Sequence, residues 1–303
     1  MPTSHPPHTL PRSMWALLAL LTLGWGMNWP MMKLALTDIP VWTFRVACTV
    51  AGAAGLFLIA RLGKLPVRVP QGQLPRLCLI AFFNVTMWNV LIAYGLTLLP
   101  SGRSAILAYS MPLWVVLLSA FVLHEKLTAR RILGLTLGIS GMGLLIGGAF
   151  TSVQTSPLGA ALVIGAAMSW ALGTVLMRRF PVTLGTTALT AWQLLVGSLP
   201  IVLGALILEW DTWRSVGMGA ALGLAYNVLV VSIFCYWAWF RIAASAPAGV
   251  AALSTLMIPI VGVFSSMVIL GEIPHWRDYA ALVLVIAALA TVLVPGRPSS
   301  QLS

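Results

Sequence analysis

The segments PSGRSAILAYSMP, residues 100–112, and PAGVAALSTLMIP, residues 247–259, carry the same frame of special residues. Each starts with proline, has glycine two positions later and ends on a second proline twelve positions after the first. The frame continues to a glutamate in both cases, because Glu125 follows the first segment as Glu272 follows the second, at the same offset of 147 residues. This repetition indicates that the chain consists of two related halves.

The composition of the chain indicates which solvent surrounds these halves. Of its 303 residues, 60% are hydrophobic and only 8% are charged, whereas a soluble domain usually carries about 25% charged residues. A lipid bilayer tolerates such a chain, and it admits only helices or closed barrels. The apolar runs are continuous and about 20 residues long, which is typical of helices rather than of alternating barrel strands. The sequence therefore predicts an all-α polytopic membrane protein.

Pro, Gly and charged residues divide the chain into ten expected transmembrane helices, five in each half. They lie near residues 14–36, 41–60, 74–96, 101–122, 131–149, 157–177, 184–208, 216–240, 248–270 and 276–294. An odd number of spans per half requires two inverted copies, as in many secondary transporters. The predicted organisation is a disordered tail at 1–13, a first five-helix repeat at 14–149, a linker at 150–156, an inverted five-helix repeat at 157–294 and a second tail at 295–303.

Basic residues predict the orientation of the spans. With the N-terminus inside, most of the 17 Lys and Arg residues fall on the cytoplasmic side, and the outer side keeps Lys33, Arg45, Arg103, Arg214 and Arg277. We therefore expect a multi-pass protein of the cell inner (plasma) membrane with both termini in the cytoplasm. The net charge of +11 is interpreted as an insertion signal and as contact with anionic lipid, since no solvated surface is left for a nucleic acid.

The prolines of the repeated frame predict where helices bend. Pro112 and Pro259 lie about halfway along their spans, where each removes a hydrogen bond to the carbonyl four residues back. A freed carbonyl at membrane depth is tolerated where it faces protein or water rather than lipid. One isolated kink could serve packing alone, but two kinks at equivalent positions of inverted halves favour a central cavity lined by the fourth and ninth spans.

Polar and aromatic side chains at membrane depth are the candidates to line that cavity, because burying them without a role is costly. The candidates are Trp25, Asn28, Asn84, Trp88, Asn89, Tyr109, Ser110, Trp170, Gln193, Tyr236, Trp237, Trp239, Ser254 and Thr255. Trp25 and Trp170 correspond at an offset of 145 residues, and either cavity lining or helix packing would explain them. The asparagines and Gln193 could instead bond neighbouring helices. For Glu125 and Glu272, at span ends, capping or pairing with Arg130 and Arg277 is expected.

The two frames, within residues 99–146 and 246–293, resemble the EamA family of the drug/metabolite transporter superfamily. The Pro…Gly…Pro…Glu spacing is the most specific part, and the likeness covers nearly the whole chain. The tryptophan-rich spans are similar to those of YddG-type exporters of aromatic and other amino acids. The resemblance implies a basket of helices around a central cavity, with alternating access by rocking of the two halves.

Missing residue types restrict the chemistry of the expected cavity. No Asp, Glu or His falls in the middle of an expected span, and a proton-coupled carrier normally keeps such a titratable group at depth. The sequence thus predicts export, without an intramembrane carboxylate, of a small amphipathic solute that packs on Trp and Tyr. Aromatic and other hydrophobic amino acids fit best. Other small metabolites or drugs such as purines, or a passive channel, are the alternatives.

Catalysis and bound cofactors are not expected. The spans contain no HExxH motif and no paired aspartates. The three cysteines, Cys48, Cys78 and Cys235, lie within spans and lack the spacing of metal ligands. We therefore predict a transporter of small molecules with no enzymatic activity, no cofactor and no metal. The sequence leaves the oligomeric state open, and a monomer is plausible.

Overall fold

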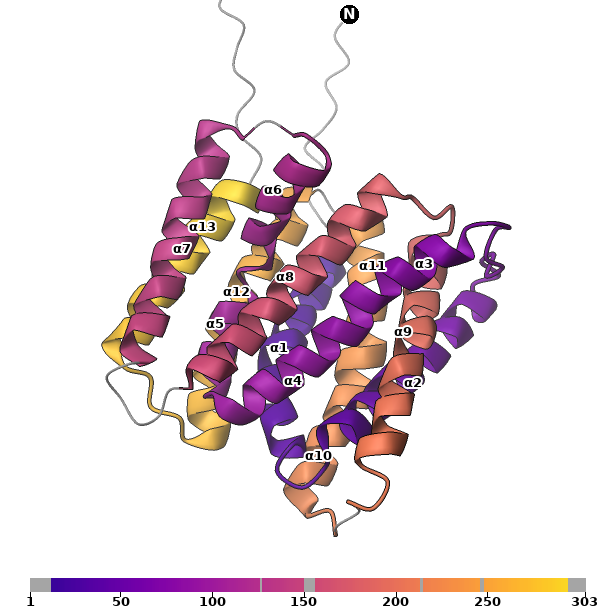
Figure 1. The fold of residues 1–303 in the computed structure, drawn as a ribbon, viewed down its shortest axis with the longest axis horizontal. Coiled ribbons are helices and arrows are strands. Elements are labelled where there is room, and N and C mark those ends of the chain that lie inside the picture. The colour runs from indigo at the N-terminus through magenta and orange to yellow at the C-terminus, as the bar shows by residue number, and fades with distance from the viewer. Residues whose placement is uncertain (1–11, 126, 150–155, 213–214, 246–247, 294–303) are drawn as a thin grey trace, which may run out of the picture.

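The computed structural model describes residues 12–125, 127–149, 156–212, 215–245 and 248–293, without the side chains of some residues near the ends of these ranges. Its first half contains α1 (Arg12–Ala35), α2 (Val41–Leu62), α3 (Leu74–Ala81), the π-helix η1 (Phe82–Met87), α4 (Trp88–Leu98), α5 (Ser101–Ala108), α6 (Met111–Val122) and α7 (Ala129–Ala149). Its second half contains α8 (Pro157–Arg179), α9 (Thr186–Leu208), α10 (Met218–Tyr226), the π-helix η2 (Asn227–Cys235), α11 (Tyr236–Ser245), α12 (Ala248–Leu270) and α13 (Trp276–Leu293) (Figure 1).

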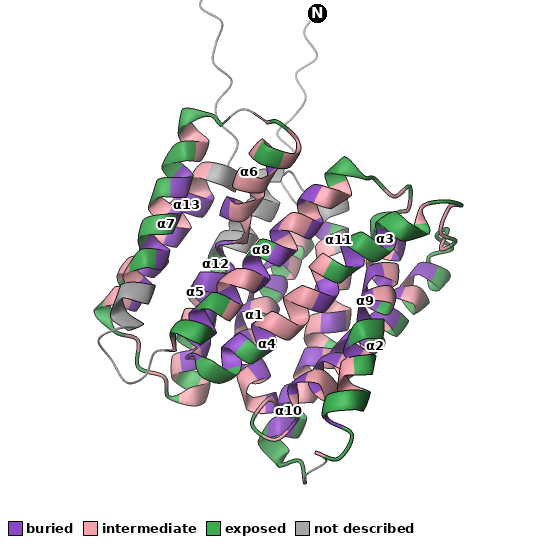
Figure 2. Ribbon diagram, viewed as in Figure 1, coloured by how far each residue is buried: buried purple, intermediate pink, exposed green. Residues whose placement is uncertain are grey.

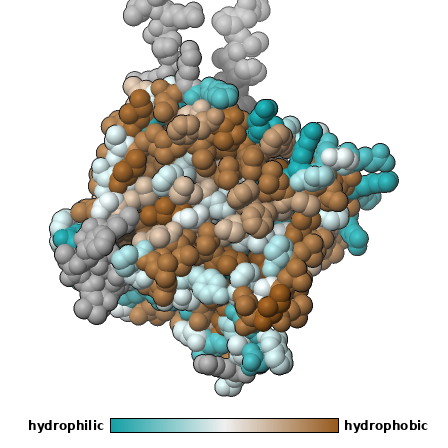
Figure 3. Space-filling model, viewed as in Figure 1, coloured by the Kyte–Doolittle hydropathy of each residue, from teal (hydrophilic) through white to brown (hydrophobic). Residues whose placement is uncertain are grey.

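Helical structure occupies each of the expected spans, and the apolar surface is that of a membrane protein. Within the described ranges, six helical rods are long and apolar enough to cross a membrane: Val41–Leu62, Leu74–Leu98, Ser101–Val122, Pro157–Arg179, Thr186–Leu208 and Met218–Trp239. Apolar side chains cover much of the face drawn in Figure 3. Phe121, Met218 and Val268 are each at least 75% exposed, which lipid tails accommodate and water does not. The protein is therefore a multi-pass membrane protein.

The fourth expected span consists of two helices instead of one kinked helix. α5 ends at Ala108 and α6 begins at Met111, with a two-residue turn between them. Pro112 stands in the first turn of α6, where its missing N–H needs no partner. A continuous helix would drive the proline ring against the carbonyl of Ala108. Pro259, in contrast, lies inside the continuous α12. The equivalent prolines thus produce a break in one half and an uninterrupted helix in the other.

Two of the rods widen into π-helix at equivalent places. η1 starts at Phe82, between α3 and α4, and η2 starts 145 residues later at Asn227, between α10 and α11. The wider turn changes which backbone groups face each other, and a side chain compensates in η2, where Ser232 Oγ donates to the Asn227 carbonyl at 2.9 Å. The two halves therefore share a local irregularity of the helix as well as a sequence frame.

The contacts between helices keep the same pattern when the two halves are exchanged. α7 packs against α13 at one edge of the bundle, and α2 packs against α9 toward the opposite edge (Figure 1). α1 packs against α12 and against the α10–η2–α11 rod, just as α8 packs against the α5–α6 rod and the α3–η1–α4 rod. Figure 2 shows the buried residues concentrated where these rods face one another. The centre of the bundle is thus built by α1, α8 and the rods that cross them.

Candidate functional site

Five aromatic side chains from both halves of the chain gather around α1. Trp25 lies 6.3 Å from Tyr236 and 5.7 Å from Trp239 of α11, measured between ring centroids. Trp29, one turn further along α1, lies 6.5 Å from Tyr109, in the turn between α5 and α6. Both tyrosine contacts are edge-to-face, an arrangement that aromatic rings prefer. We call these five residues the aromatic cluster.

The aromatic cluster brings together four of the sequence candidates and adds a fifth residue. Trp29 is absent from the candidates, although it is only 5% exposed. Its spacing of four residues from Trp25 is the signal that would have found it, since residues four apart share a helix face. Trp88 packs at the border of the same buried core, which also contains Trp29 and Tyr109. The candidates Trp25, Trp88, Tyr109, Tyr236 and Trp239 therefore lie in one region.

Asn28 lies beside Trp25 on α1. It stands three residues after Trp25 and four before Met32, so the three side chains follow one face of the helix. The side-chain carbonyl oxygen of Asn28 is buried and, among the residues that the structure describes, finds no hydrogen-bond partner. Buried polar atoms in proteins are nearly always hydrogen-bonded. Asn28 thus offers an unused acceptor next to the aromatic cluster.

Arg45 places a buried cation close to the same face of α1. It lies one turn into α2 and is only 6% exposed. Its Nη2 lies 2.7 Å from the sulfur of Met32, its Cζ lies 5.1 Å from the centroid of the Phe44 ring, and its Nε has no partner in the described part of the chain. Tyr236 and Cys48 lie within electrostatic range of the guanidinium. The distribution of basic residues assigns Arg45 to the outer side of the membrane. Its place inside the second expected span, however, is a signal for a buried charge.

The turn between α5 and α6 gives the neighbours Tyr109 and Ser110 different surroundings. Tyr109 enters the aromatic cluster, as described above. Ser110 Oγ donates to the carbonyl of Leu107 at 2.6 Å and accepts a hydrogen bond from Trp114 Nε1 at 3.1 Å. The serine hydroxyl therefore satisfies polar groups at the helix break, which was the site of the kink expected from Pro112.

Asn84 and Gln193 bond to each other between η1 and α9. Asn84 Nδ2 donates to Gln193 Oε1 at 3.1 Å and lies 3.3 Å from the sulfur of Met177. α8 approaches closely here, because a Cβ atom at Gly173 would lie 2.1 Å from Asn84 Oδ1. The interhelical bond matches the packing alternative for these two candidates. Asn89, in turn, donates to the Val85 carbonyl of its own rod at 2.8 Å.

The remaining candidates form no ring pair with the aromatic cluster within the described residues, or their side chains fall outside those residues. Trp237 packs on Phe234, with ring centroids 5.9 Å apart. Trp170 is half-buried on α8 and forms no ring pair with the residues that the structure describes. Ser254 and Thr255 belong to α12, but their side chains fall outside the described residues. The equivalence of Trp25 and Trp170 in sequence therefore does not extend to their ring contacts.

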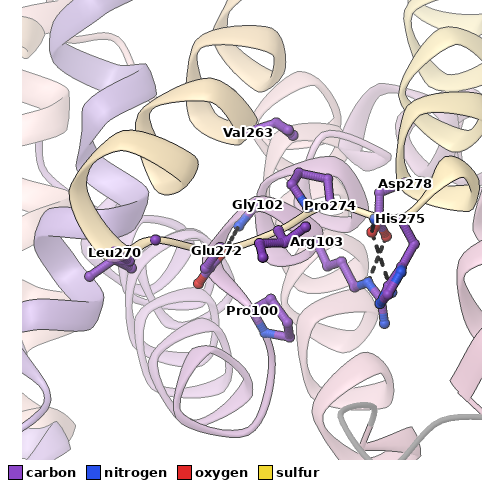
Figure 4. A pocket seen from close by; sticks show the side chains of 11 residues that line it. Pro100, Gly102, Arg103, Val263, Leu270, Glu272, Pro274, His275 and Asp278 are labelled. Carbon is purple, nitrogen blue, oxygen red and sulfur yellow. Dashed lines mark hydrogen bonds and ion pairs between the residues drawn. The ribbon is translucent and has the colours of Figure 1, made fainter.

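A pocket of about 420 Å³ opens where the segment after α12 meets the start of α5 (Figure 4). At its edge, the Glu272 carboxylate accepts hydrogen bonds from the backbone N–H groups of Ser101 at 2.7 Å and Gly102 at 3.1 Å. It also accepts the Ser101 hydroxyl at 3.0 Å. A negative charge at this position interacts favourably with the positive end of the α5 dipole. Glu272 thus caps a helix, one of its two expected roles, and the helix belongs to the other half.

Other acidic residues near this end also connect the halves. Asp278, from α13, pairs with Arg103 of α5 at 2.6 Å, and both side chains are largely buried. Glu209, at the end of α9, accepts the backbone N–H groups of Trp42 at 3.0 Å and Thr43 at 2.8 Å at the start of α2. Each contact joins a carboxylate of the second half to a helix of the first. Together with Glu272 they hold the two halves against each other.

Glu125, the counterpart of Glu272 in the first half, also reaches the other half. Its carboxylate forms ion pairs with Arg178 at the end of α8 and, at 3.0 Å, with Arg131 of α7. Ion pairing is one of its two expected roles, but these two partners differ from the expected Arg130. Among the described residues, no group of three or more His, Cys, Asp or Glu side chains is placed to hold a metal ion.

Several known proteins are similar to this chain along nearly its whole length. The uncharacterized transporter YvbV of Bacillus subtilis is 28% identical over 289 residues, covering 93% of this chain and 92% of its own. A probable amino-acid metabolite efflux pump of Salmonella typhimurium is 26% identical over 283 residues, covering 90% of this chain and 92% of its own. A solved crystal structure superposes with a TM-score of 0.63 at 20% identity and covers 93% of this chain and 96% of its own. That protein and this one share a fold.

The profile of the EamA-like transporter family matches the chain twice. The first match covers residues 13–147 and the second covers residues 157–294. The two matches fall on the two halves that carry the repeated proline frame, and together they span most of the chain. The chain belongs to the EamA-like transporter family.

Proposed function

We propose that this transporter exports small metabolites, with aromatic and other hydrophobic amino acids as its substrates, by alternating access. The observation that carries the proposal is the aromatic cluster, which joins α1 and the α5–α6 turn of the first half to α11 of the second. Its five side chains are uncharged, and Trp and Tyr rings provide both apolar surface and a polar edge for an amphipathic solute. The names of the Salmonella typhimurium and Escherichia coli relatives, probable amino-acid metabolite efflux pumps, support the same substrate class.

We further propose that the protein crosses the membrane ten times, as two inverted five-helix repeats at 14–149 and 157–294 around a central solute path. The double family match, the exchange symmetry of the helix contacts and the two π-helical segments support a repeat. Five spans per repeat make the copies antiparallel. By the distribution of basic residues, both termini lie in the cytoplasm and the membrane is the bacterial inner membrane.

Labelling of single cysteines tests the inverted arrangement directly. With inverted repeats, the loop after α6, near residues 123–131, and the loop after α12, near residues 271–276, face opposite sides of the bilayer. A membrane-impermeant maleimide added to intact cells should label only the second loop. Labelling of both loops from the same side would overturn the inverted repeat and, with it, the alternating-access proposal.

Counterflow in proteoliposomes tests the substrate class. Vesicles loaded with unlabelled phenylalanine should accumulate labelled phenylalanine transiently and saturably, which a passive channel does not do. Trp25→Ala should reduce this flux at least tenfold, because it removes the ring at the centre of the aromatic cluster, whereas Trp15→Ala, at a 51% exposed position near the start of α1, should not. Trp170→Ala tests whether the repeat-related tryptophan also lines the path.

The outcomes of this assay separate the parts of the proposal. No amino-acid flux from wild-type protein would remove the substrate class. Non-saturable flux without counterflow would replace the carrier with a channel. Unchanged flux in Trp25→Ala would remove the aromatic cluster from the solute path.

A further inference from the structure

We propose that Arg45 and Asn28 recognise the two charged groups of a zwitterionic amino acid, with Arg45 binding the carboxylate and Asn28 the ammonium group. Trp25 and Tyr236 then contact the side chain of the solute. The inference rests on the proposed function for the identity of the solute. The roles of the two residues follow from the contacts of the protein itself.

Arg45 is a buried cation that meets no carboxylate of the residues that the structure describes. Its Nη2 contacts only the thioether of Met32 at 2.7 Å, its Nε has no partner, and no Asp or Glu of the described residues lies within ion-pair distance. A thioether sulfur is a weak acceptor, and an unpaired charge in a protein interior or a bilayer is costly. An ionisable side chain that is kept buried inside a transmembrane span in spite of this cost indicates a functional partner.

A carboxylate is the partner that suits a guanidinium in this setting. The planar guanidinium presents parallel N–H donors that match the two oxygens of a carboxylate. The Phe44 ring, with its centroid 5.1 Å from Arg45 Cζ, covers one face of the guanidinium plane. The unbonded Nε and the weakly bonded Nη2 form one edge of the guanidinium, which is the edge that a carboxylate engages with two hydrogen bonds.

Arg103 shows what a buried arginine with a structural role looks like in the same protein. Its Nε donates to Asp278 Oδ1 at 2.6 Å and its Nη2 donates to Asp278 Oδ2 at 3.3 Å (Figure 4). Within the described ranges, one buried arginine thus has a two-point acid partner and Arg45 has none. Arg103 therefore serves as the matched control for any experiment on Arg45.

Asn28 supplies the complementary acceptor one helical turn away. Its side-chain oxygen is buried and finds no partner in the described part of the chain. Asn28 stands four residues before Met32, the residue that touches Arg45. Residues four apart on a helix are about 6 Å apart, which is within the reach of the ammonium group of an amino acid whose carboxylate is bound at Arg45. A neutral amide oxygen can accept from an ammonium group without a carboxylate in the membrane.

The aromatic rings complete this set of contacts. Trp25 shares the helix face of Asn28 and Met32, and it lies 6.3 Å from Tyr236. Tyr236 is in turn close enough to Arg45 to interact electrostatically with it. The donor edge, the acceptor and the rings therefore lie on α1, α2 and α11, where Arg45 meets Met32 and Trp25 meets Tyr236. This arrangement specifies a zwitterionic amino acid with an aromatic or other hydrophobic side chain. It does not specify a solute without charged groups or one with a positive charge alone.

Binding of three phenylalanine-like probes to the full chain in lipid nanodiscs tests the two roles separately. L-phenylalanine has both charged groups, 3-phenylpropionate has only the carboxylate, and 2-phenylethylamine has only the ammonium group. Arg45→Gln should weaken the first two probes by roughly ten- to a hundredfold, the value of a lost charge-assisted hydrogen bond, and leave the amine within about threefold. Asn28→Leu should weaken phenylalanine and the amine by about tenfold and spare 3-phenylpropionate.

Two further variants distinguish recognition from folding. Arg45→Lys keeps the charge but not the two-point donor edge, so it should bind 3-phenylpropionate with an affinity between those of wild type and Arg45→Gln. Arg103→Gln should lower the melting temperature, because it leaves Asp278 buried and unpaired, but it should keep the wild-type ratio of affinities for 3-phenylpropionate and the amine.

Each result decides the proposal. An unchanged affinity ratio in Arg45→Gln, or no carboxylate binding by wild-type protein, would overturn the assignment of Arg45 whatever the transport assay shows. An equal loss of all three probes in Asn28→Leu would overturn the assignment of Asn28. Carboxylate binding that depends on Arg45 without amino-acid counterflow would keep this site and overturn the proposed amino-acid export instead.

Discussion

Glu272→Gln removes the negative charge that holds the second half against the start of α5. The carboxylate accepts the backbone N–H groups of Ser101 and Gly102 and the hydroxyl of Ser101. Glutamine retains one acceptor oxygen and turns an NH₂ group toward donors, so at least one of these bonds is lost. A hydrogen bond to a charged group contributes about 1.5–3 kcal/mol. We call this end closed when Glu272 is bonded to the start of α5, and open when it is not. We therefore expect Glu272→Gln to destabilise the closed arrangement by about 2 kcal/mol relative to the open one.

A loss of this size multiplies the population of the open arrangement by roughly thirty. Val263 reports that population, because it lines the same pocket as Glu272 and is only 2% exposed. The assay uses Val263→Cys in a chain whose Cys48, Cys78 and Cys235 are replaced by alanine. The rate of labelling by a membrane-impermeant maleimide in proteoliposomes should rise about thirtyfold when Glu272→Gln is added.

Glu209→Gln is the control for this experiment. Glu209 caps the start of α2 with the same pattern of bonds, to two backbone N–H groups and to the hydroxyl of Thr43. The Glu209→Gln variant should lower the melting temperature by about as much as Glu272→Gln does. It should leave the labelling of a cysteine at position 263 unchanged. Equal acceleration by both variants, or none by Glu272→Gln, would refute the idea that the Glu272 carboxylate closes this end of the bundle.

Two further predictions concern the packing of the helices. Gly26→Ala places a Cβ atom 2.3 Å from Val261 Cγ1 of α12, so this substitution should reduce stability by about 1–3 kcal/mol and lower the melting temperature in detergent. A Cβ atom at Gly143 would meet no atom of the described residues within 4 Å, so Gly143→Ala should be neutral or slightly stabilising. Identical melting of the two variants would contradict the close approach of α1 and α12. A double-mutant cycle of Asn84→Leu and Gln193→Leu should give a coupling energy of about 0.5–1.5 kcal/mol in thermal unfolding, and strictly additive effects would show that the two amides do not bond.

The helices and the internal repeat follow from the sequence because a bilayer leaves the chain few alternatives. Continuous apolar runs must become helices, and the proline frames of the two halves mark equivalent rods. The consequence of each proline does not follow in the same way. Pro112 accompanies a complete break, whereas Pro259 lies in a continuous helix. Trp114 Nε1 donates to Ser110 Oγ at the break, at 3.1 Å, and the proline spacing alone does not predict this bond.

The site is less predictable than the fold, because helix faces and burial depend on tertiary structure. A spacing of four residues places Asn84 and Trp88 on one face of an α-helix, but Asn84 lies within η1 and Trp88 follows it. Asn84 reaches Gln193, while Trp88 borders the central core. Arg45 counts as an outer residue in a topology rule that weighs charge near span ends. Its place inside a span indicates burial, but its contact with Met32 of another helix is revealed by no local pattern.

The two π-helical segments also bear on the ancestry of the chain. A helix accommodates one additional residue by widening a turn, so two wide turns at equivalent points require either two independent insertions or one insertion that was later copied. η1 and η2 start 145 residues apart, and a single insertion before gene duplication accounts for both with one event fewer. Under the proposed inverted repeat, the ancestral protein is a five-helix chain that already carries the widened third helix and assembles as an antiparallel pair.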